Sequence, residues 1–476
     1  NYANPVVRKP SAGTWTALLY TDSFTGTVHL SATEQHAAPT GHVSPSTFTL
    51  APGQHRDVTV TSTFPTTGDT ADSVTFAAAG ATTTVPDLLR ALLPLPGTFS
   101  GTITGGNGRG GDPAQTFTYA FDVPAGAPGL NVSTTLARDE NQVLQGVLLD
   151  PNGETRSIGT NLPIEQVLDP TNVPDHTDPS LSMSVADPQP GRWRFVLAPQ
   201  NPVPGTALGL PFTGTVSLHS AVTATAHLPA TLPAGKPTTA TVTLTNTSPA
   251  TVYVQADART ATVGQVKLGA RLLPGQGMPS TVTLPITGFN APSYLVPPDT
   301  TALTATATST VANQVELASV GTSGAWGGLD AVGGAGTTST ATLSEPNGPL
   351  GQGDWTVATT EIGPFGPDGE PPAQADLAVT ATTLGFDSSV TSSTGDPYAE
   401  SLDGDADAGT PLAVAPGKTA TITLTITPTA PAGTTVDGTL NIVSPGDATL
   451  FGRVLNNLVV SSGDVLAAVP YRYTVG

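Results

Sequence analysis

Alternation of polar and apolar residues is the main pattern along this chain. In the clearest example, Thr419-Ala-Thr-Ile-Thr-Leu-Thr-Ile-Thr427, Thr side chains occupy one side and aliphatic side chains the other. Similar stretches begin at Asp57 and Thr239. β-branched residues suit a half-buried pleated surface, and no long window places apolar residues at helical spacing. The pattern therefore predicts an all-β protein made of short antiparallel strands.

One short apolar segment fits two kinds of element. Asp87-Leu-Leu-Arg-Ala-Leu-Leu93 lies between Pro86 and Pro94. The flanking prolines limit its length, because proline removes a backbone donor and fixes its own φ. The segment is either a short helix or the final strand of its unit.

A first kind of unit, unit A, is marked by a repeated closing half. Phe24-Thr-Gly-Thr-Val-His-Leu30 recurs as Phe212-Thr-Gly-Thr-Val-Ser-Leu218, and a Gly-x-Trp motif precedes each copy, at Trp15 and at Trp193. A third Gly-x-Trp contains Trp355. We expect these tryptophans to be equivalent core anchors, because buried Trp contributes a large apolar surface.

The opening half of unit A also repeats. Phe121-Asp-Val-Pro matches Tyr294-Leu-Val-Pro, and Asp150-Pro-Asn-Gly153 matches Glu345-Pro-Asn-Gly348. The second pair has the composition of a tight turn between strands. Unit A is then roughly a hundred residues of short strands, for which a jelly-roll-like sandwich is the expected fold.

A second unit, unit B, follows each unit A. Its mark is a Pro-Gly or Ala-Gly turn that runs into a Thr-rich strand. Copies of the turn occur at Leu50-Ala-Pro-Gly53, Leu232-Pro-Ala-Gly235 and Val414-Ala-Pro-Gly417. Several short strands with frequent turns predict an immunoglobulin- or fibronectin-III-like sandwich.

The expected fold is an all-β string of antiparallel β-sandwiches, with jelly-roll-like units alternating with immunoglobulin/fibronectin-III-like units. The expected boundaries are 1–33 for the closing strands of a truncated jelly-roll-like unit, 34–96 for a fibronectin-III-like sandwich, 97–226 for a jelly-roll-like sandwich, 227–292 for an immunoglobulin-like sandwich, 293–385 for a jelly-roll-like sandwich and 386–476 for a fibronectin-III-like sandwich. Only 14 residues precede Trp15, whereas Trp193 lies 72 positions after Phe121. We therefore expect the first unit A to be incomplete and the chain to be the C-terminal part of a longer polypeptide.

Charge and composition narrow the possible partners. The formal net charge of −20 repels nucleic acid phosphates and anionic lipid surfaces. The chain contains no Cys, which is compatible with bacterial secretion and leaves stability to packing alone. No apolar run approaches the length of a membrane span. We expect a secreted, extracellular protein without nucleic-acid binding or membrane insertion.

The best metal candidate is the acidic run Asp403, Asp405 and Asp407. Alternate carboxylates on an irregular loop can wrap Ca²⁺, which binds six to eight oxygens. Ala408 stands where an EF-hand needs Gly, so an EF-hand is excluded. Calcium is the only cofactor that the sequence suggests, and a solvated acidic loop is the commoner alternative.

Trp326 is the candidate ligand-binding residue. It lies in Gly-Ala-Trp-Gly-Gly and has no counterpart in the repeats, so it could stack on a sugar or peptide; packing across a loop is the alternative. The nearby run Gly321-Thr-Ser-Gly324 is similar to a serine-peptidase nucleophile but lacks the Met-Ala continuation, and we interpret it as a turn. We predict no catalytic residue in this chain.

Several motifs together resemble a known family. The chain is similar throughout its length to the C-terminal non-catalytic region of large secreted subtilisin-like serine peptidases of high-GC Gram-positive bacteria. The resemblance implies an upstream catalytic domain with an Asp, His, Ser triad, but the Asp-Thr-Gly, His-Gly-Thr-His and Gly-Thr-Ser-Met signatures are absent from this sequence. The motifs that carry it are Pro10-Ser-Ala-Gly-Thr-Trp15, Phe121-Asp-Val-Pro-Ala-Gly-Ala-Pro128, Pro188-Gln-Pro-Gly-Arg-Trp193, Tyr294-Leu-Val-Pro-Pro298 and Leu466-Ala-Ala-Val-Pro-Tyr-Arg-Tyr-Thr-Val475.

The resemblance implies an accessory region that acts as a spacer, a stabiliser, or a binding array for substrate or cell envelope. The expected partners are the upstream peptidase fragment of the same precursor and a protein substrate or cell-envelope glycan. The alternative is an extracellular adhesin or carbohydrate-binding surface protein. Because sandwich folds host both roles, fold alone does not decide between them.

Overall fold

The computed structural model describes residues 12–16, 41–63, 67–103, 116–138, 142–161, 177–199, 209–273, 276–277, 281–286, 293–309, 315–320, 326–332, 338–344, 349–361, 373–395, 410–444 and 463–476. Every regular element in these ranges is a β-strand, which confirms the all-β prediction. The chain forms two units, one including Leu92–Gly476 and the other spanning Asn4–Ala91, and each is described by itself. Within the described ranges, no helix has the length and apolar character needed to cross a bilayer.

Eight consecutive strands of the larger unit form a first jelly roll. They are β5 (Gly97–Ile103), β6 (Phe117–Val123), β7 (Gly129–Leu136), β8 (Leu144–Leu149), β9 (Thr155–Thr160), β10 (Ser180–Ala186), β11 (Gly191–Pro199) and β12 (Leu210–Ser217). The strand orders β10-β7-β12-β5 and β6-β11-β8-β9 in two four-stranded sheets are those of a jelly roll. Trp193, Phe121 and Phe212 are fully buried in its core.

The repeated Phe-Thr-Gly-Thr-Val motif has a packing reason in this jelly roll. Gly214 of the motif lies directly opposite Phe99 on β5, and Phe212 lies opposite Gly101. A Cβ atom on either glycine would overlap the aromatic ring of its partner. Glycine therefore makes room for a ring that lies across the neighbouring strand.

A second jelly roll repeats the same arrangement. Its strands are β17 (Ala270–Leu273), β18 (Gln276–Gly277), β19 (Thr281–Ile286), β20 (Ser293–Val296), β21 (Ala302–Ser309), β22 (Val315–Val320), β23 (Trp326–Val332), β24 (Thr338–Ser344), β25 (Gly353–Glu361) and β26 (Ala373–Phe386). The order β20-β25-β22-β23 matches β6-β11-β8-β9 of the first jelly roll, and β26-β21-β24 matches β12-β7-β10. Trp355 and Tyr294 are buried in this core, so the sequence match of Tyr294 to Phe121 identifies equivalent strands.

A third sandwich combines two distant segments of the chain. Its strands are β13 (Val222–His227), β14 (Thr231–Leu232), β15 (Thr238–Asn246), β16 (Val252–Leu268), β27 (Val390–Ser392), β28 (Leu412–Val414), β29 (Thr419–Ile426), β30 (Thr435–Val443) and β31 (Val465–Val475). One sheet has the order β13-β15-β29-β27, and the other contains β14-β31-β30-β16. We call this sandwich the host sandwich.

The host sandwich corrects the expected domain boundaries. The sequence predicts separate sandwiches at residues 227–292 and 386–476, and this prediction is wrong because residues 238–245 of strand β15 pair with the whole of β29. One core joins Val242 and Leu244 of the earlier segment to Leu424 and Tyr473 of the later one. Each segment alone has too few strands to cover its apolar face, and the other segment supplies the missing cover.

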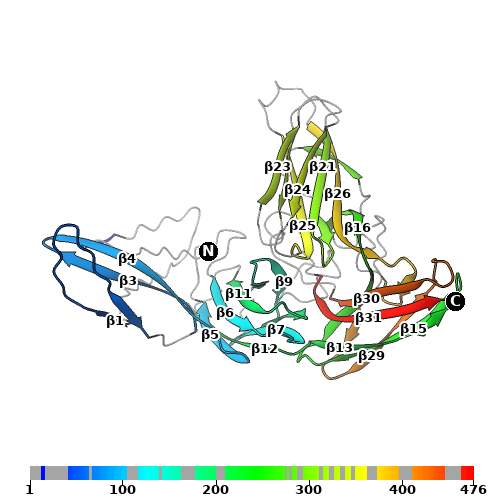
Figure 1. Ribbon diagram of the computed structural model, residues 1–476, viewed down its shortest axis with the longest axis horizontal. Coiled ribbons are helices and arrows are strands. Elements are labelled where there is room, and N and C mark those ends of the chain that lie inside the picture. The colour runs from blue at the N-terminus through cyan, green and yellow to red at the C-terminus, as the bar shows by residue number, and fades with distance from the viewer. Residues whose placement is uncertain are drawn as a thin grey trace, which may run out of the picture. The chain divides into compact units, whose positions relative to one another are not determined.

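The second jelly roll is an insertion into the host sandwich. Strand β16 pairs with β30 over Gln255–Thr260. It pairs with β26 at Arg259 and, after an irregularity, over Val263–Leu268. Strand β26 returns the chain to the host, and Figure 1 shows it beside β16. Leu268 already packs in the core of the second jelly roll. That jelly roll therefore begins before residue 293, its expected boundary.

The smaller unit contains two strand pairs. Strand β1 (Gly41–Ser44) pairs with β2 (Thr59–Ser62), and β3 (Gly68–Ala78) forms a hairpin with β4 (Ala81–Ala91), blue in Figure 1. The apolar segment that begins at Asp87 lies mainly in β4, so it is a strand and no helix. Among the described residues, no side chain of this unit belongs to a buried core cluster.

Trp15 differs from its counterparts in the jelly rolls. It is 56% exposed and lies outside any strand, so the prediction that it is a core anchor is wrong. Trp193 is buried because its strand β11 pairs with β6 and β8 inside a closed sandwich. In the described part of the smaller unit, no strand pairs with the segment that contains Trp15.

Candidate functional site

The two buried tryptophans make the same hydrogen bond. Trp193 Nε1 donates to the carbonyl oxygen of Gln189 at 2.8 Å, and Trp355 Nε1 donates to that of Gly351 at 2.7 Å. In both jelly rolls the acceptor lies four residues before the Trp. This bond fixes the loop that leads into the Trp strand, so the Gly-x-Trp repeat positions equivalent loops.

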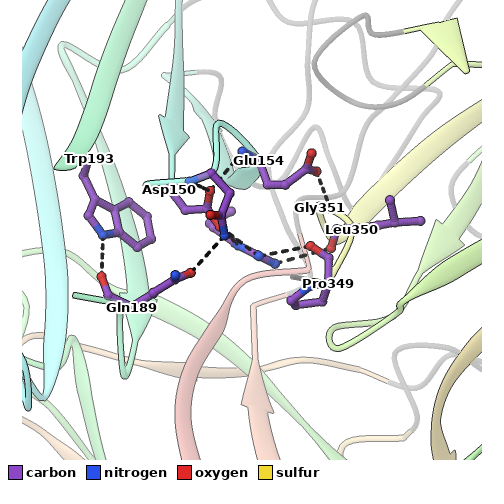
Figure 2. Close-up of polar contacts among 9 residues, drawn as sticks. Asp150, Glu154, Gln189, Trp193, Pro349, Leu350 and Gly351 are labelled. Atoms are coloured by element: carbon purple, nitrogen blue, oxygen red, sulfur yellow. Dashed lines mark hydrogen bonds and ion pairs between the residues drawn. The ribbon is translucent and has the colours of Figure 1, made fainter. Parts of the chain in front are cut away.

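A buried carboxylate organises the turn between β8 and β9 (Figure 2). Asp150 Oδ1 accepts hydrogen bonds from the backbone nitrogens of Asn152, at 2.8 Å, and Glu154, at 3.0 Å. Asp150 Oδ2 accepts from Arg156 Nε at 2.9 Å. The ion pair therefore holds the Arg156 side chain in one orientation, at the edge of the first jelly roll.

Arg156 reaches the second jelly roll. Its Nη2 donates to the carbonyl oxygen of Pro349 at 3.0 Å, and its Nη1 to that of Leu350 at 3.4 Å. Glu154 Oε2 accepts from the backbone nitrogen of Gly351 at 3.2 Å. A Cβ atom on Gly351 would lie 2.5 Å from the Thr155 carbonyl oxygen, so only glycine allows the two backbones to approach this closely.

The host sandwich also forms hydrogen bonds with both jelly rolls near Arg156. Ser157 Oγ donates to Asp464 Oδ2, and Gln352 Nε2 donates to the carbonyl oxygen of Gly463 at 3.2 Å. Three sandwiches therefore meet through hydrogen bonds. We call this group the junction cluster; it consists of Asp150, Glu154, Arg156, Ser157, residues 349–352, Gly463 and Asp464.

A second polar group lies where the inserted jelly roll joins its host. Arg259 Nε lies 2.7 Å from Asp257 Oδ2, and both side chains are buried. Arg259 Nη1 donates to the carbonyl oxygen of Leu384 at 3.1 Å, and the guanidinium stacks on the Phe386 ring. The arginine thus connects outgoing strand β16 to returning strand β26. Burial raises the pKa of Asp257, and Arg259 opposes that shift.

The chain just after β26 is bound to the last strand of the host. Asp387 Oδ2 accepts from the Tyr471 hydroxyl at 2.5 Å, and Asp387 Oδ1 accepts from Ser389 Oγ at 2.5 Å. Ser389 Oγ also lies 3.0 Å from the Tyr473 hydroxyl. Burial and the nearby carboxylate of Asp387 raise the pKa of Tyr471. We call this second polar group the neck cluster; it consists of Asp257, Arg259, Phe386, Asp387, Ser389, Tyr471 and Tyr473.

The predicted site residues stand apart from both clusters. Asp403, Asp405 and Asp407 lie outside the described residues, so a calcium loop stays a prediction. Trp326 begins β23 and pairs with Val320, but its side chain is outside the described part, so its ligand role also stays a prediction. In the ranges that the structure describes, no group of three His, Asp or Glu side chains is placed to hold a metal ion.

The sequence signal nearest to the junction cluster was the Asp-Pro-Asn-Gly turn. Asp150-Pro-Asn-Gly153 connects β8 to β9, whereas Glu345-Pro-Asn-Gly348 falls between β24 and β25. The two motifs therefore occupy different places in the strand order, and the second motif lies outside the described residues. Pro349 and Leu350, which follow the second motif in sequence, accept hydrogen bonds from Arg156 just after the first.

Comparison with known proteins yields low similarity. No protein-family model matches the chain, and no curated protein matches it. Tripeptidyl peptidase II is similar with a TM-score of 0.24 and 12% identity, over 83% of this chain and 31% of that one. The exported protein XepA of PBSX has a TM-score of 0.16 and 9% identity, over 62% and 90%. A DUF4785 family protein from Legionella pneumophila has 0.13 and 10%, over 87% and 93%. Scores this low establish no shared function.

Proposed function

We propose that this chain is a non-catalytic accessory region of a secreted subtilisin-like serine peptidase, in which it acts as a rigid spacer and stabiliser. The observation that carries the spacer role is the contact of Arg156, held by Asp150, with the backbone carbonyls of Pro349 and Leu350. The peptidase lineage is supported by the sequence motifs. The proposed partner is the peptidase fragment of the same precursor, outside the cell.

Two features of the larger unit favour rigidity over free hinge motion. Charge-assisted hydrogen bonds such as those of Arg156 are stronger and more directional than neutral ones. The second jelly roll is also tied to its host by two paired strands, β16 and β26. Adjacent domains ordinarily move about a flexible linker. A paired double connection bends less easily than one linker, because bending it disrupts the ladder between the strands.

The spacer role has a direct structural test. Small-angle scattering and hydrogen exchange of the whole chain should show that Arg156→Ala broadens the distribution of interdomain distances and exposes the Gly351 amide. Arg192→Ala is the matched control, because Arg192 pairs with Asp122 on the exposed surface of the first jelly roll. If Arg156→Ala leaves both measurements unchanged, the junction cluster does not hold the sandwiches in place.

The peptidase lineage is tested by the coding sequence before Asn1 and the polypeptide it encodes. We expect a Gly-Thr-Ser-Met run there, and a serine-hydrolase probe should label that polypeptide and leave this chain unlabelled. The two fragments should purify together. Labelling of this chain, or an upstream sequence without the run, contradicts the proposal. Binding to a glycan array that is lost in Trp326→Ala would favour an adhesin instead.

A further inference from the structure

The three copies of the Pro-Gly or Ala-Gly turn differ in burial. Leu232 and Val414, which open the second and third copies, are 0% and 3% exposed in the core of the host sandwich. Leu50, which opens the first copy in the smaller unit, is 46% exposed. The same position therefore packs in a closed core in two copies and faces outward in the first.

The strand after each turn shows the same difference. Val60, Val242 and Leu424 each stand seven residues after the turn glycine. Val242 and Leu424 are 0% and 1% exposed, whereas Val60 is 41% exposed. The hairpin shows the same difference. Val85-Pro86 of β4 matches Val469-Pro470 of β31, and the residues two positions earlier pair with Phe76 and Ile442 respectively. Phe76 is exposed, whereas Ile442 is fully buried. An apolar face that the host sandwich closes is thus open in the smaller unit.

The host closes this face by pairing equivalent strands. Thr241 lies directly opposite Thr423 in the antiparallel pair of β15 and β29, and each stands six residues after its turn glycine, Gly235 or Gly417. Antiparallel pairing of equivalent residues is the arrangement that a two-fold axis generates. Each half of the host sandwich therefore carries an edge strand, β15 or β29, that can pair with the equivalent strand of another such half.

The smaller unit contains one half of this sheet. Strand β1 pairs with β2 as β13 pairs with β15 and as β27 pairs with β29. Among the described residues, no strand pairs with the other edge of β2. Unpaired edges and exposed apolar faces are the features by which strands recruit another chain. The residue of β2 that matches Thr241 and Thr423 is Thr59, six residues after Gly53.

We propose that the half-sandwich formed by β1, β2, β3 and β4 (residues 41–63 and 67–91) is a docking surface for a second copy of this chain. The two copies pair antiparallel through β2, with Thr59 opposite Thr59 of the other copy, and enclose Leu50, Val60 and Phe76 between them. The occupant is a second copy because the host already shows two such halves closing on each other about equivalent residues. The interface is isologous, so it closes as a dimer.

Cysteine cross-linking tests the pairing register, because the full chain contains no Cys. Thr59→Cys should form an intermolecular disulfide under mild oxidation, since directly opposite residues have Cβ atoms about 4.5–5.5 Å apart. Thr61→Cys is the matched control on the same side of β2. Its two copies would lie more than about 13 Å apart, because four residues separate them along the strand. Equal cross-linking of both variants, or none in Thr59→Cys, overturns the proposal.

Sedimentation equilibrium of the full chain tests the dimer independently. Wild-type protein should dimerise reversibly, and Val60→Lys should weaken dimerisation by at least about tenfold, because a charge would be buried in the apolar interface. Thr61→Lys adds the same charge on the outer side of β2 and should change dimerisation less than about threefold. A wild-type monomer at all concentrations, or a dimer insensitive to Val60→Lys, overturns the proposal and assigns this face to another partner or to none.

Discussion

The guanidinium carbon of Arg259 lies 3.5 Å from the centroid of the Phe386 ring. Arg259 stands on β16, where the chain leaves the host sandwich, and Phe386 ends β26, where the chain returns. Their contact therefore holds together the two strands that connect the inserted jelly roll to the host sandwich. A cation over an aromatic face is strongest where water is excluded, and Arg259 is fully buried.

Removing the neck arginine should destabilise the host sandwich. Arg259→Met leaves the Asp257 carboxylate buried without its cation, which costs about 3–5 kcal/mol when a buried pair is broken. The double variant Asp257→Asn with Arg259→Met should recover part of the loss. Phe386→Leu should cost less, because it keeps the ion pair. Urea unfolding followed by tyrosine fluorescence measures all three, and a loss below about 1 kcal/mol in Arg259→Met contradicts a dry ion pair.

The junction arginine should matter more than a surface arginine of the same jelly roll. Arg156→Ala should lower the free energy of unfolding by about 1–3 kcal/mol. The substitution removes the cation that pairs with the buried Asp150 carboxylate and the donor that hydrogen-bonds to two backbone carbonyls. Arg192→Ala should cost less than about 1 kcal/mol, since its pair with Asp122 is exposed. Chemical denaturation gives both values. Equal losses would mean that the Arg156 contacts contribute no more than a surface pair.

The repeat offers a reciprocal exchange at Tyr294 and Phe121. The Tyr294 hydroxyl is buried and has no hydrogen-bond partner among the described residues, whereas the matching position in the first jelly roll is Phe121. Tyr294→Phe should stabilise the second jelly roll by about 1 kcal/mol or more, because it removes an unsatisfied buried donor. Phe121→Tyr should destabilise the first. Calorimetric unfolding of both variants decides, and a loss of stability in Tyr294→Phe contradicts this reading.

Alkaline pH should unfold the protein through its buried tyrosines. Burial raises the pKa of Tyr119 to about 12, and it also raises the pKa of Tyr294. An unfolded tyrosine ionises near pH 10, so the folded state keeps its proton where the unfolded state loses it. This stability is complete below about pH 10 and is lost as the pH rises toward the folded pKa.

Absorbance titration of phenolate formation measures this effect. The native protein should show fewer tyrosines ionising between about pH 10 and 11 than the chain in denaturant. Tyr119→Phe should move the midpoint of alkaline unfolding to higher pH, provided that the variant has the same free energy of unfolding as the wild type at neutral pH. A native titration identical to the denatured one would show that these hydroxyls are open to water.

Much of the fold could be read from local pattern. The Thr and aliphatic alternation around Thr423 predicts a strand with one buried face, and β29 has that burial. The Gly-x-Trp repeat identifies Trp193 and Trp355 as equivalent, and their matching hydrogen bonds agree. Trp15 shows the limit of this inference, because it carries the same motif and is exposed.

The polar clusters could not be read in the same way. Arg156 and Pro349 are separated by 193 positions, and Ser157 and Asp464 by 307. No periodicity links residues so far apart, and each is an ordinary surface type until its partner is known. The pairs Asp257–Arg259 and Asp387–Ser389 are close in sequence, but two polar residues at that spacing do not show that they are buried. Burial of these pairs comes from the strands that pack around them.

The sequence by itself determined the strands, the turns and the two repeating motifs, because alternation and turn chemistry act over a few residues. Only the tertiary structure decided which halves close on each other. Strands β2, β15 and β29 carry the same pattern and offer the same kind of edge, so local energetics do not choose among their pairings. The connectivity of the chain determines the pairing. The inserted jelly roll separates β15 from β29 in sequence, and its paired strands β16 and β26 bring the two halves back together, where β15 pairs with β29.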